Sequence, residues 1–473
     1  MKWVFVIIFV AAVLLSVIAV VTLPKHRADD VVCTLVWATD DNPARAEQME
    51  LFRQWYREKY GEKIDIRIDP AAAWDYSKIV VQSIAGAGPD LFDFFGMEGL
   101  ERLLSSGILL DVTDTANAKG FGRDAAWESI WTSFVFDGRQ YGFPDNVTAD
   151  CILYHKKQFE KAGLPLPSGD WTWDEFLAVA KHFSYARGQG LRQYAILDLD
   201  PLVMIYQNGG TMFTPEGTRC CIDSPEAIEA LQFFDDLRRV HKVMPTAAEL
   251  ASQSAAGGWG GNWINLFATG YFTMAAAGRW WFIGLARDAS AAIAEGKPSP
   301  YDIGVAPMPY FKKKYVRCGA RVTGISRTSK NITYALRFLE YLASEPFNRQ
   351  INRTFDALAP AKKYCTGPSG IADGPAPPPG LEAANDPMWT TVMEYAREAD
   401  RSPFIPPYRV GTLWWELKGS LDAGDVSPEQ MLHTLAARIN EEIRRNVKKD
   451  PALRARYEEA LARENNAASA AVN

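Results

Sequence analysis

Tryptophan gives the clearest indication of possible binding chemistry in this chain, which contains 15 tryptophans. Several lie beside glycines or at the ends of expected helices and strands, where a side chain can project into a loop. An indole ring can cover the apolar C–H face of a sugar ring with little loss of side-chain entropy. Such a ring can equally anchor a core or a domain contact, so each position carries both interpretations. The tryptophans in these positions are Trp37, Trp74, Trp259, Trp263, Trp280, Trp281, Trp414 and Trp415.

Signatures of common catalytic, cofactor and metal sites are absent from the sequence. It contains no G-x-S-x-G elbow, no H-E-x-x-H, no G-x-x-x-x-G-K-[ST] and no G-x-G-x-x-G. The five histidines are scattered, and the six cysteines show no zinc spacing. We therefore predict a protein that is not an enzyme and that uses no metal and no cofactor. One alternative stays open, because Glu98, Asp145 and Asp150 could pair in space as glycosidase carboxylates do.

Length and composition are typical of a globular protein with a sizeable core. The 473 residues predict about two to four domains, and 48% of them are hydrophobic. The net charge is −6, and the sequence lacks the concentrated basic face that phosphate binding requires. We therefore expect no nucleic acid partner.

Residues 1–30 are expected to lie outside the fold. The uncharged run from Trp3 to Leu23 is about long enough to span a bilayer as a helix. This favours an uncleaved N-terminal membrane anchor, with a cleaved signal peptide as the alternative. Both predict that the rest of the chain is exported to the periplasmic or extracellular face of the cytoplasmic membrane. For an exported chain, the six cysteines form one or two disulfides or remain as buried free thiols.

The elements that position these residues alternate between strand and helix patterns at the start of the chain. In order, they are a strand at Val31–Ala38, a helix from Asn42 to Tyr60, a strand through Ile64–Ile68, a helix at Tyr76–Ala85 and a strand at Asp90–Phe95. This alternation predicts an α/β fold with a parallel, doubly wound sheet. The ligands of such sheets lie at the carboxyl ends of the strands.

The later part of the chain is predicted to be more helical. Thr172 with Glu175 and Ser427 with Gln430 form capping boxes, each of which starts a helix. Residues 463–473 are expected to be a disordered tail.

Several segments, in order, resemble one known family. GAGPDLFDFF at 86–95 and ATGYFTMAAAGRWW at 268–281 resemble two of its motifs, and YGFPDNVTADCILYHKKQFEKAGLPLPSGDWTWDEF at 141–176 is the strongest match. The family is that of the extracellular solute-binding proteins of sugar ABC transporters, the maltose-binding-protein-like group. The chain departs from the family pattern at His155, where asparagine is usual, and at Ala275, where methionine is common.

This resemblance implies a type II periplasmic-binding-protein fold, in which two α/β lobes joined by a three-segment hinge enclose a ligand cleft. The implied lobes are 31–146 plus 309–343 (lobe 1) and 147–308 plus 344–462 (lobe 2). The implied crossings between them lie at Asp145–Lys156, near Gly304–Pro309 and near Ala343–Phe347.

The resemblance also implies ligand-binding positions. They are the loop after the first strand (Trp37, Thr39, Asp40, Asp41), the end of a later strand (Phe94, Phe95, Met97, Glu98), the first crossing (Asn146, Thr148) and two tryptophans of the second lobe (Trp280, Trp414). Polarity and loop position add Trp74, Arg279 and Arg321 to this set.

The function that the resemblance implies is binding of a carbohydrate for delivery to the permease subunits of an ABC importer, by a protein that acts as a monomer. Two alternatives stay open, which are a glycosidase-like enzyme and a sugar-sensing module coupled to a membrane partner. The sequence does not name the sugar. Arg279, Arg317 and Arg321 hint at an acidic sugar, although arginines also bind neutral hydroxyls.

Overall fold

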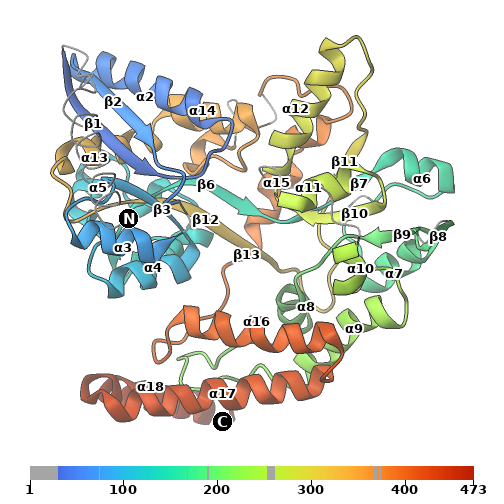
Figure 1. The fold of residues 1–473 in the computed structure, drawn as a ribbon. Helices are drawn as coiled ribbons and strands as arrows, with labels where there is room; N and C mark the ends of the chain where they lie inside the picture. The colour runs from blue at the N-terminus through green and yellow to red at the C-terminus, as the bar shows by residue number, and fades with distance from the viewer. Residues whose placement is uncertain are drawn as a thin grey trace, which may run out of the picture.

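The computed structural model describes residues 30–472 except 74, 168, 189–190, 253–260, 367–369 and 372–373. Two β-sheets organise this part of the chain. They lie on the left and right of Figure 1, and the long strands β6 (Phe143–Ala149) and β12 (Val316–Ile325) run from the first sheet toward the second.

The first sheet has six strands and is mixed. Its order is β13 (Ala396–Arg397), β12, β3 (Leu91–Phe95), β1 (Val31–Ala38) and β2 (Lys63–Ile68), and β6 also pairs with β12. β1 is parallel to β2 and β3, whereas β12 is antiparallel to β3 and β6. The helices around it are α2 (Arg45–Tyr60), α3 (Tyr76–Ile84), α4 (Gly96–Ser105), α5 (Thr113–Lys119), α13 (Ile332–Leu342) and α14 (Glu345–Thr354).

The second sheet has five strands, in the order β11 (Ile303–Ala306), β7 (Cys151–His155), β10 (Phe272–Ala277), β9 (Leu191–Ile196) and β8 (Tyr185–Gly188). β10 is the central strand, and its apolar sequence FTMAAA is almost entirely buried because neighbours cover both its edges and its faces. The helices in this part of the chain are α6 (Lys156–Ala162), α7 (Trp173–His182), α8 (Pro201–Asn208), α9 (Pro225–Arg239), α10 (Ala247–Ser252), α11 (Gly261–Ala268) and α12 (Trp281–Ala294).

Four further helices follow, and the last three lie along the bottom of Figure 1. They are α15 (Met388–Thr391), α16 (Pro407–Ala423), α17 (Pro428–Lys449) and α18 (Pro451–Val472). α16 packs against α4, and α17 packs against α9, so this helical layer contacts elements from the parts of the chain around both sheets.

We call the first sheet with its helices (residues 30–149 and 316–354) the first lobe, and the second sheet with its helices (150–315) the second lobe. The chain passes between them at Asp150, between β11 and β12, and again after α14. The third passage therefore comes later than the predicted Ala343–Phe347, because α14 packs against α2 of the first lobe. A two-residue strand, β13, later rejoins the first sheet, and the sequence pattern did not predict it.

The predicted α/β class, the early strand–helix alternation and both capping boxes are confirmed. The tail prediction was wrong for 463–472, which continue α18. This segment is rich in alanine, a strong helix former, and Arg463 and Glu464 contact Glu216 and Thr218. All six cysteines are free thiols. Among the described residues no helix is long and apolar enough to cross a membrane, and the predicted anchor at 3–23 lies outside them.

Candidate functional site

A cleft of about 960 Å³ lies between the lobes, and both lobes and the C-terminal helices line it. Its first-lobe wall follows from the parallel pairing of β1 with β3, since parallel strands end at the same edge of a sheet. Asp40 and Asp41 follow β1, and Phe95 to Glu98 form the junction of β3 with α4. Gly96 has a φ of 51°, a conformation that favours glycine, and it turns the chain from strand into helix there.

The crossing strands form the floor of the cleft. Asn146 and Thr148 on β6, Asp150 after it, and Arg317 and Arg321 on β12 all line the cleft. The hydroxyl oxygen of Thr148 is buried and has no hydrogen-bond partner. A buried polar atom without a partner is unfavourable, so this hydroxyl is suited to bind a polar group that enters the cleft.

Tryptophans line the opposite wall. Trp280 is half-buried and packs edge-to-face on Trp281, with ring centroids 6.1 Å apart. A Cβ atom on Gly278 would lie 2.3 Å from the Thr148 hydroxyl oxygen and 2.7 Å from the Trp280 ring, so only glycine permits this close approach. Trp263 and Trp415 are 38% and 65% exposed, which leaves apolar ring faces available to a ligand.

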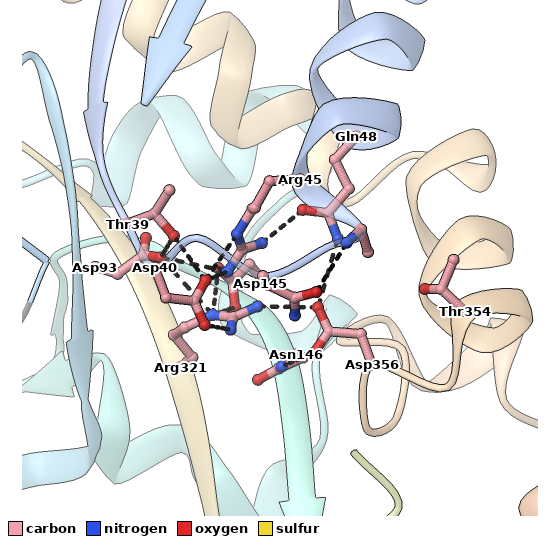
Figure 2. Close-up of polar contacts among 12 residues, drawn as sticks. Thr39, Asp40, Arg45, Gln48, Asp93, Asp145, Asn146, Arg321, Thr354 and Asp356 are labelled. Atoms are coloured by element: carbon pink, nitrogen blue, oxygen red, sulfur yellow. Dashed lines mark hydrogen bonds and ion pairs between the residues drawn. The ribbon is translucent and has the colours of Figure 1, made fainter. Parts of the chain in front are cut away.

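A buried cluster of charged side chains lies behind the first-lobe wall (Figure 2). Its members are four carboxylates (Asp40, Asp93, Asp145, Asp356) and two guanidinium groups (Arg45, Arg321). Arg321 donates from Nε to Asp145 at 2.7 Å, from Nη1 to Asp40 at 3.3 Å and from Nη2 to Asp356 at 3.2 Å. The cluster thus joins β1, β6, β12 and the passage after α14, all at the edge of the cleft.

The carboxylates of this cluster outnumber its cations. Burial raises the pKa of Asp93 and raises that of Asp145 well above its usual range, although the two arginines act in the opposite direction. Asp93 also accepts hydrogen bonds from the Trp37 indole, at 2.7 Å, and from the Thr323 hydroxyl, at 2.8 Å. Burial and the neighbouring carboxylates Asp93 and Asp356 thus both favour the neutral form of Asp145.

Acidic side chains outside this cluster also line the cleft. Burial raises the pKa of Asp150 to about 6 and that of Glu398 to about 7. The hydroxyls of Thr132 and Ser133, at the end of the short helix η2 (Glu128–Ser133), donate to Glu398. Among the described residues, nine carboxylate side chains line the cleft and four cationic ones do. An anionic ligand is therefore disfavoured by charge.

Glu398 makes stability depend on pH. Its pKa of about 7 in the folded protein exceeds the ordinary value of 4.5, so folding favours the protonated form. The stabilisation of the folded state by protonated Glu398 is fully present below pH 4.5 and is lost as the pH rises through 7. Between pH 5 and 8 the wild type should lose roughly 2–3 kcal/mol of stability through Glu398. We expect Glu398→Gln to lack this part of the pH-dependent loss. Urea unfolding at several pH values measures this, with the exposed Glu394→Gln as the control. An identical pH dependence in the wild type and Glu398→Gln would contradict the expectation.

Ten of the predicted site residues line the cleft. They are Asp40, Asp41, Phe95, Met97, Glu98, Asn146, Thr148, Trp280, Arg321 and Trp414. Trp414 is only 4% exposed, so its neighbour Trp415 offers more ring surface.

Four predicted residues do not line the cleft, and Trp74 lies outside the described residues. Trp37 and Phe94 are core side chains, and Thr39 is buried with its hydroxyl on Asp93. Arg279 is buried and donates to backbone carbonyls. These four lie at strand ends or in a turn beside the cleft, but their side chains point into the protein rather than into the opening.

Lining residues outside the predicted binding set are Asp150, Asp198, Asp200, Met212, Phe213, Trp263, Trp281, Arg317, Glu398, Asp400, Arg401 and Trp415. The sequence had marked five of them in other ways, namely Asp150 as a glycosidase carboxylate, Arg317 as a hint of an acidic sugar, and the three tryptophans as candidate stacking rings. The loop-like positions of Trp263, Trp281 and Trp415 were the available signal. No sequence signal predicted that Glu398 to Arg401 lie at the cleft, because their position depends on the pairing of β13 with β12.

Of the three carboxylates named for the glycosidase alternative, Glu98 and Asp150 line the cleft and Asp145 does not. Asp145 is buried and bonded to Arg321, so it is not available to a substrate. In the part of the chain that the structure describes, no group of three or more histidine, cysteine or carboxylate side chains could hold a metal ion.

Comparison with known families gives one match, to the model of the bacterial extracellular solute-binding proteins, over residues 40–348. A curated relative, the arabinooligosaccharide-binding protein of Halalkalibacterium halodurans, is 29% identical over 116 residues. That alignment covers 24% of this chain and 26% of the relative, so the match spans about a quarter of the relative's length.

Solved structures share the fold. The ABC substrate-binding protein Lmo0181 from Listeria monocytogenes, in complex with cycloalternan, has a TM-score of 0.70 at 21% identity. That alignment covers 86% of this chain and 98% of the Listeria chain. Maltose-bound MalE3 of T. maritima has a TM-score of 0.67 at 18% identity, and the coverage is 86% and 99%. These likenesses confirm the predicted type II periplasmic-binding-protein fold.

Proposed function

Because this chain belongs to the bacterial extracellular solute-binding protein family, we propose that it binds a carbohydrate in the interlobe cleft and delivers it to the permease of an ABC importer. The relatives and neighbours with the same fold are binding proteins rather than enzymes, and several of them carry sugars. Exported placement, by a signal peptide or an N-terminal anchor, and action as a monomer are parts of this proposal.

The observation that carries the proposal is the composition of the cleft walls. Exposed or half-buried tryptophans (Trp263, Trp280, Trp415) line the same cleft as carboxylate and amide side chains (Asp41, Glu98, Asn146). Aromatic faces match the apolar C–H surface of a sugar ring, and carboxylates and amides accept or donate hydrogen bonds to its hydroxyls. A cleft of about 960 Å³ is at the upper end of the range for small-molecule pockets, roughly 300–1,000 Å³, which favours an oligosaccharide.

The charge of the cleft argues for a neutral sugar. The arginines that hinted at an acidic sugar are engaged elsewhere, since Arg279 is buried, Arg321 is bonded to aspartates and Arg317 pairs with Asp200 at 3.2 Å. A uronate would bring its carboxylate into a cleft with an excess of carboxylates, and like charges repel.

A ligand screen tests the proposal. We expect at least one neutral oligosaccharide, among arabino-, malto- and cyclic gluco-oligosaccharides, to raise the melting temperature, because ligand that binds only the folded state stabilises it by about 2.7 kcal/mol at 100 times Kd. The matched oligogalacturonides should give no shift. Absence of a shift with every sugar in the panel, or release of new reducing ends from any of them, would contradict the proposed function. A shift with the uronates alone would contradict the charge argument.

A further inference from the structure

Arg279 is a buried cation that is held by carbonyls. It is 1% exposed, and among the described residues no carboxylate pairs with it within 4 Å. Its guanidinium donates to the backbone oxygens of Ala384 at 2.6 Å, Ala357 at 2.7 Å and Asn352 at 2.8 Å, and to Oδ1 of Asn385 at 3.2 Å. Burial lowers its pKa to about 10, so it still carries its charge at neutral pH. A buried charge without a counter-ion destabilises the folded state, so Arg279 is expected to have a specific role.

Arg279 connects the second lobe to the end of the first. Arg279 itself lies in the turn between β10 and α12 of the second lobe. Asn352 lies in the last turn of α14, in the first lobe, where helix carbonyls have no partner within the helix. Ala384 and Asn385 belong to the short helix η5 (Glu382–Asn385), which contacts β11 of the second lobe. One second-lobe guanidinium thus binds both the end of a first-lobe helix and a later segment that packs on the second lobe.

The third partner, Ala357, lies in the passage that leaves the first lobe after α14. Phe355 and Ala357 have φ angles of 61° and 62°, although neither is glycine, and the Ala357 N–H donates to the Phe355 carbonyl at 2.7 Å. Such conformations are unfavourable for residues other than glycine and persist only where the surroundings impose them. The passage is therefore strained and must be held in place.

Two arginines hold this passage from opposite lobes. Arg321 of the first lobe and Asn146 bind the Asp356 carboxylate, at 3.2 and 2.9 Å. Arg279 binds the carbonyl of the next residue, Ala357. Asp356 and Ala357 line the cleft, as does Trp280, the neighbour of Arg279. A displacement of Arg279 would therefore move Trp280 relative to the floor of the cleft.

We propose that Arg279 is a positioning residue for ligand binding, which fixes the Trp280 wall against the Asp356–Ala357 passage and thereby sets the placement of the two lobes. It does this without contact to the ligand. The inference rests on the two-lobed fold and does not depend on which ligand the cleft takes.

Interlobe distance in the ligand-free full chain is the measurement that tests this role. Spin labels on unnatural amino acids at the exposed positions Glu58 and Ala294, one in each lobe, report it by electron–electron double resonance without use of the native cysteines. We expect one narrow distance population in the wild type and a second population in Arg279→Met. Arg279→Lys keeps the charge but lacks the planar fork that reaches several carbonyls, so we expect a smaller second population.

Arg239→Met is the matched control. Arg239 also donates to backbone carbonyls at the end of a helix, namely those of Leu421 and Asp422, at 2.7 and 3.2 Å, but it does not join the two lobes. We expect this variant to lose stability while it keeps the wild-type distance. If Arg279→Met does not fold, the distance distribution of Arg279→Lys tests the proposal by itself. A wild-type distance distribution in Arg279→Lys and in every folded Arg279 variant would overturn the proposal, and so would equal broadening in Arg239→Met.

Discussion

Replacement of Arg321 by methionine should lower the free energy of unfolding by about 3–5 kcal/mol at pH 7. The guanidinium bonds Asp40, Asp145 and Asp356 in a buried cluster that already has more carboxylates than cations. Methionine fills much of the volume but leaves Arg45, which bonds Asp40 at 2.8 Å, as the one cation of a cluster with four carboxylates. A buried ion network that loses a partner in this way is strongly destabilised. Urea unfolding measures the loss. It should shrink at acid pH, because protonated aspartates no longer need the cation.

A surface ion pair in the same lobe provides the control. Arg53 bonds Asp65 at 2.9 Å and the Ile66 carbonyl at 3.0 Å, and its side chain is one-third exposed. Exposed pairs typically contribute about 0–1 kcal/mol, so Arg53→Met should lose far less stability than Arg321→Met. Equal losses in the two variants would show that the cluster is not the electrostatic centre that its geometry indicates.

Trp280→Ala should weaken sugar binding about ten- to a hundredfold. Loss of a well-placed aromatic anchor removes roughly 1–3 kcal/mol, and each 1.4 kcal/mol is about tenfold in Kd. The ring is half-buried in the cleft wall beside Trp281 and close to Thr148, so its removal should change stability less than it changes affinity. Calorimetric titration and a melting curve on the same variant give both numbers.

Trp131→Ala is the matched control for this variant. Trp131 is also half-buried, but it lies outside the cleft, where its indole donates to the Arg123 carbonyl at 2.9 Å. Its removal should leave affinity unchanged. A core role for Trp280 makes the reverse prediction, with about 3–5 kcal/mol of lost stability and intact affinity. That result would remove Trp280 from the binding site.

Local patterns in the sequence predicted the parts of the fold that depend on local physics. The alternation of Ile64, Ile66 and Ile68 specified β2, and the Thr172–Glu175 box specified the start of α7. The resemblance supplied Asp40 and the Phe95–Glu98 junction, and both agree with the general rule that ligands lie at the carboxyl ends of parallel strands. The resemblance supplied the lobes and the choice of Trp280, which composition and periodicity alone could not.

The side-chain orientations and partners that the sequence did not predict depend on contacts distant in sequence. Arg279 and Arg321 both have the charge of a ligand-binding residue, but one is bonded to carbonyls more than 70 residues away and the other to Asp40 across 281 residues. Trp37 lies at a strand end and still points inward, because Asp93 accepts its indole proton. Glu398 enters the cleft through a two-residue strand that no periodicity can reveal.

The central claim is that the two lobes close around a carbohydrate. Small-angle X-ray scattering, with and without the neutral oligosaccharide that gives the largest thermal shift, tests it most directly. A ligand that contacts both lobes stabilises the closed state, because both sets of contacts are made only there. We expect a smaller radius of gyration at saturation than in the free protein, and a radius that does not change when oligogalacturonide is added instead. An unchanged radius at saturation by a tightly bound neutral sugar would contradict it and would indicate a rigid site within one lobe.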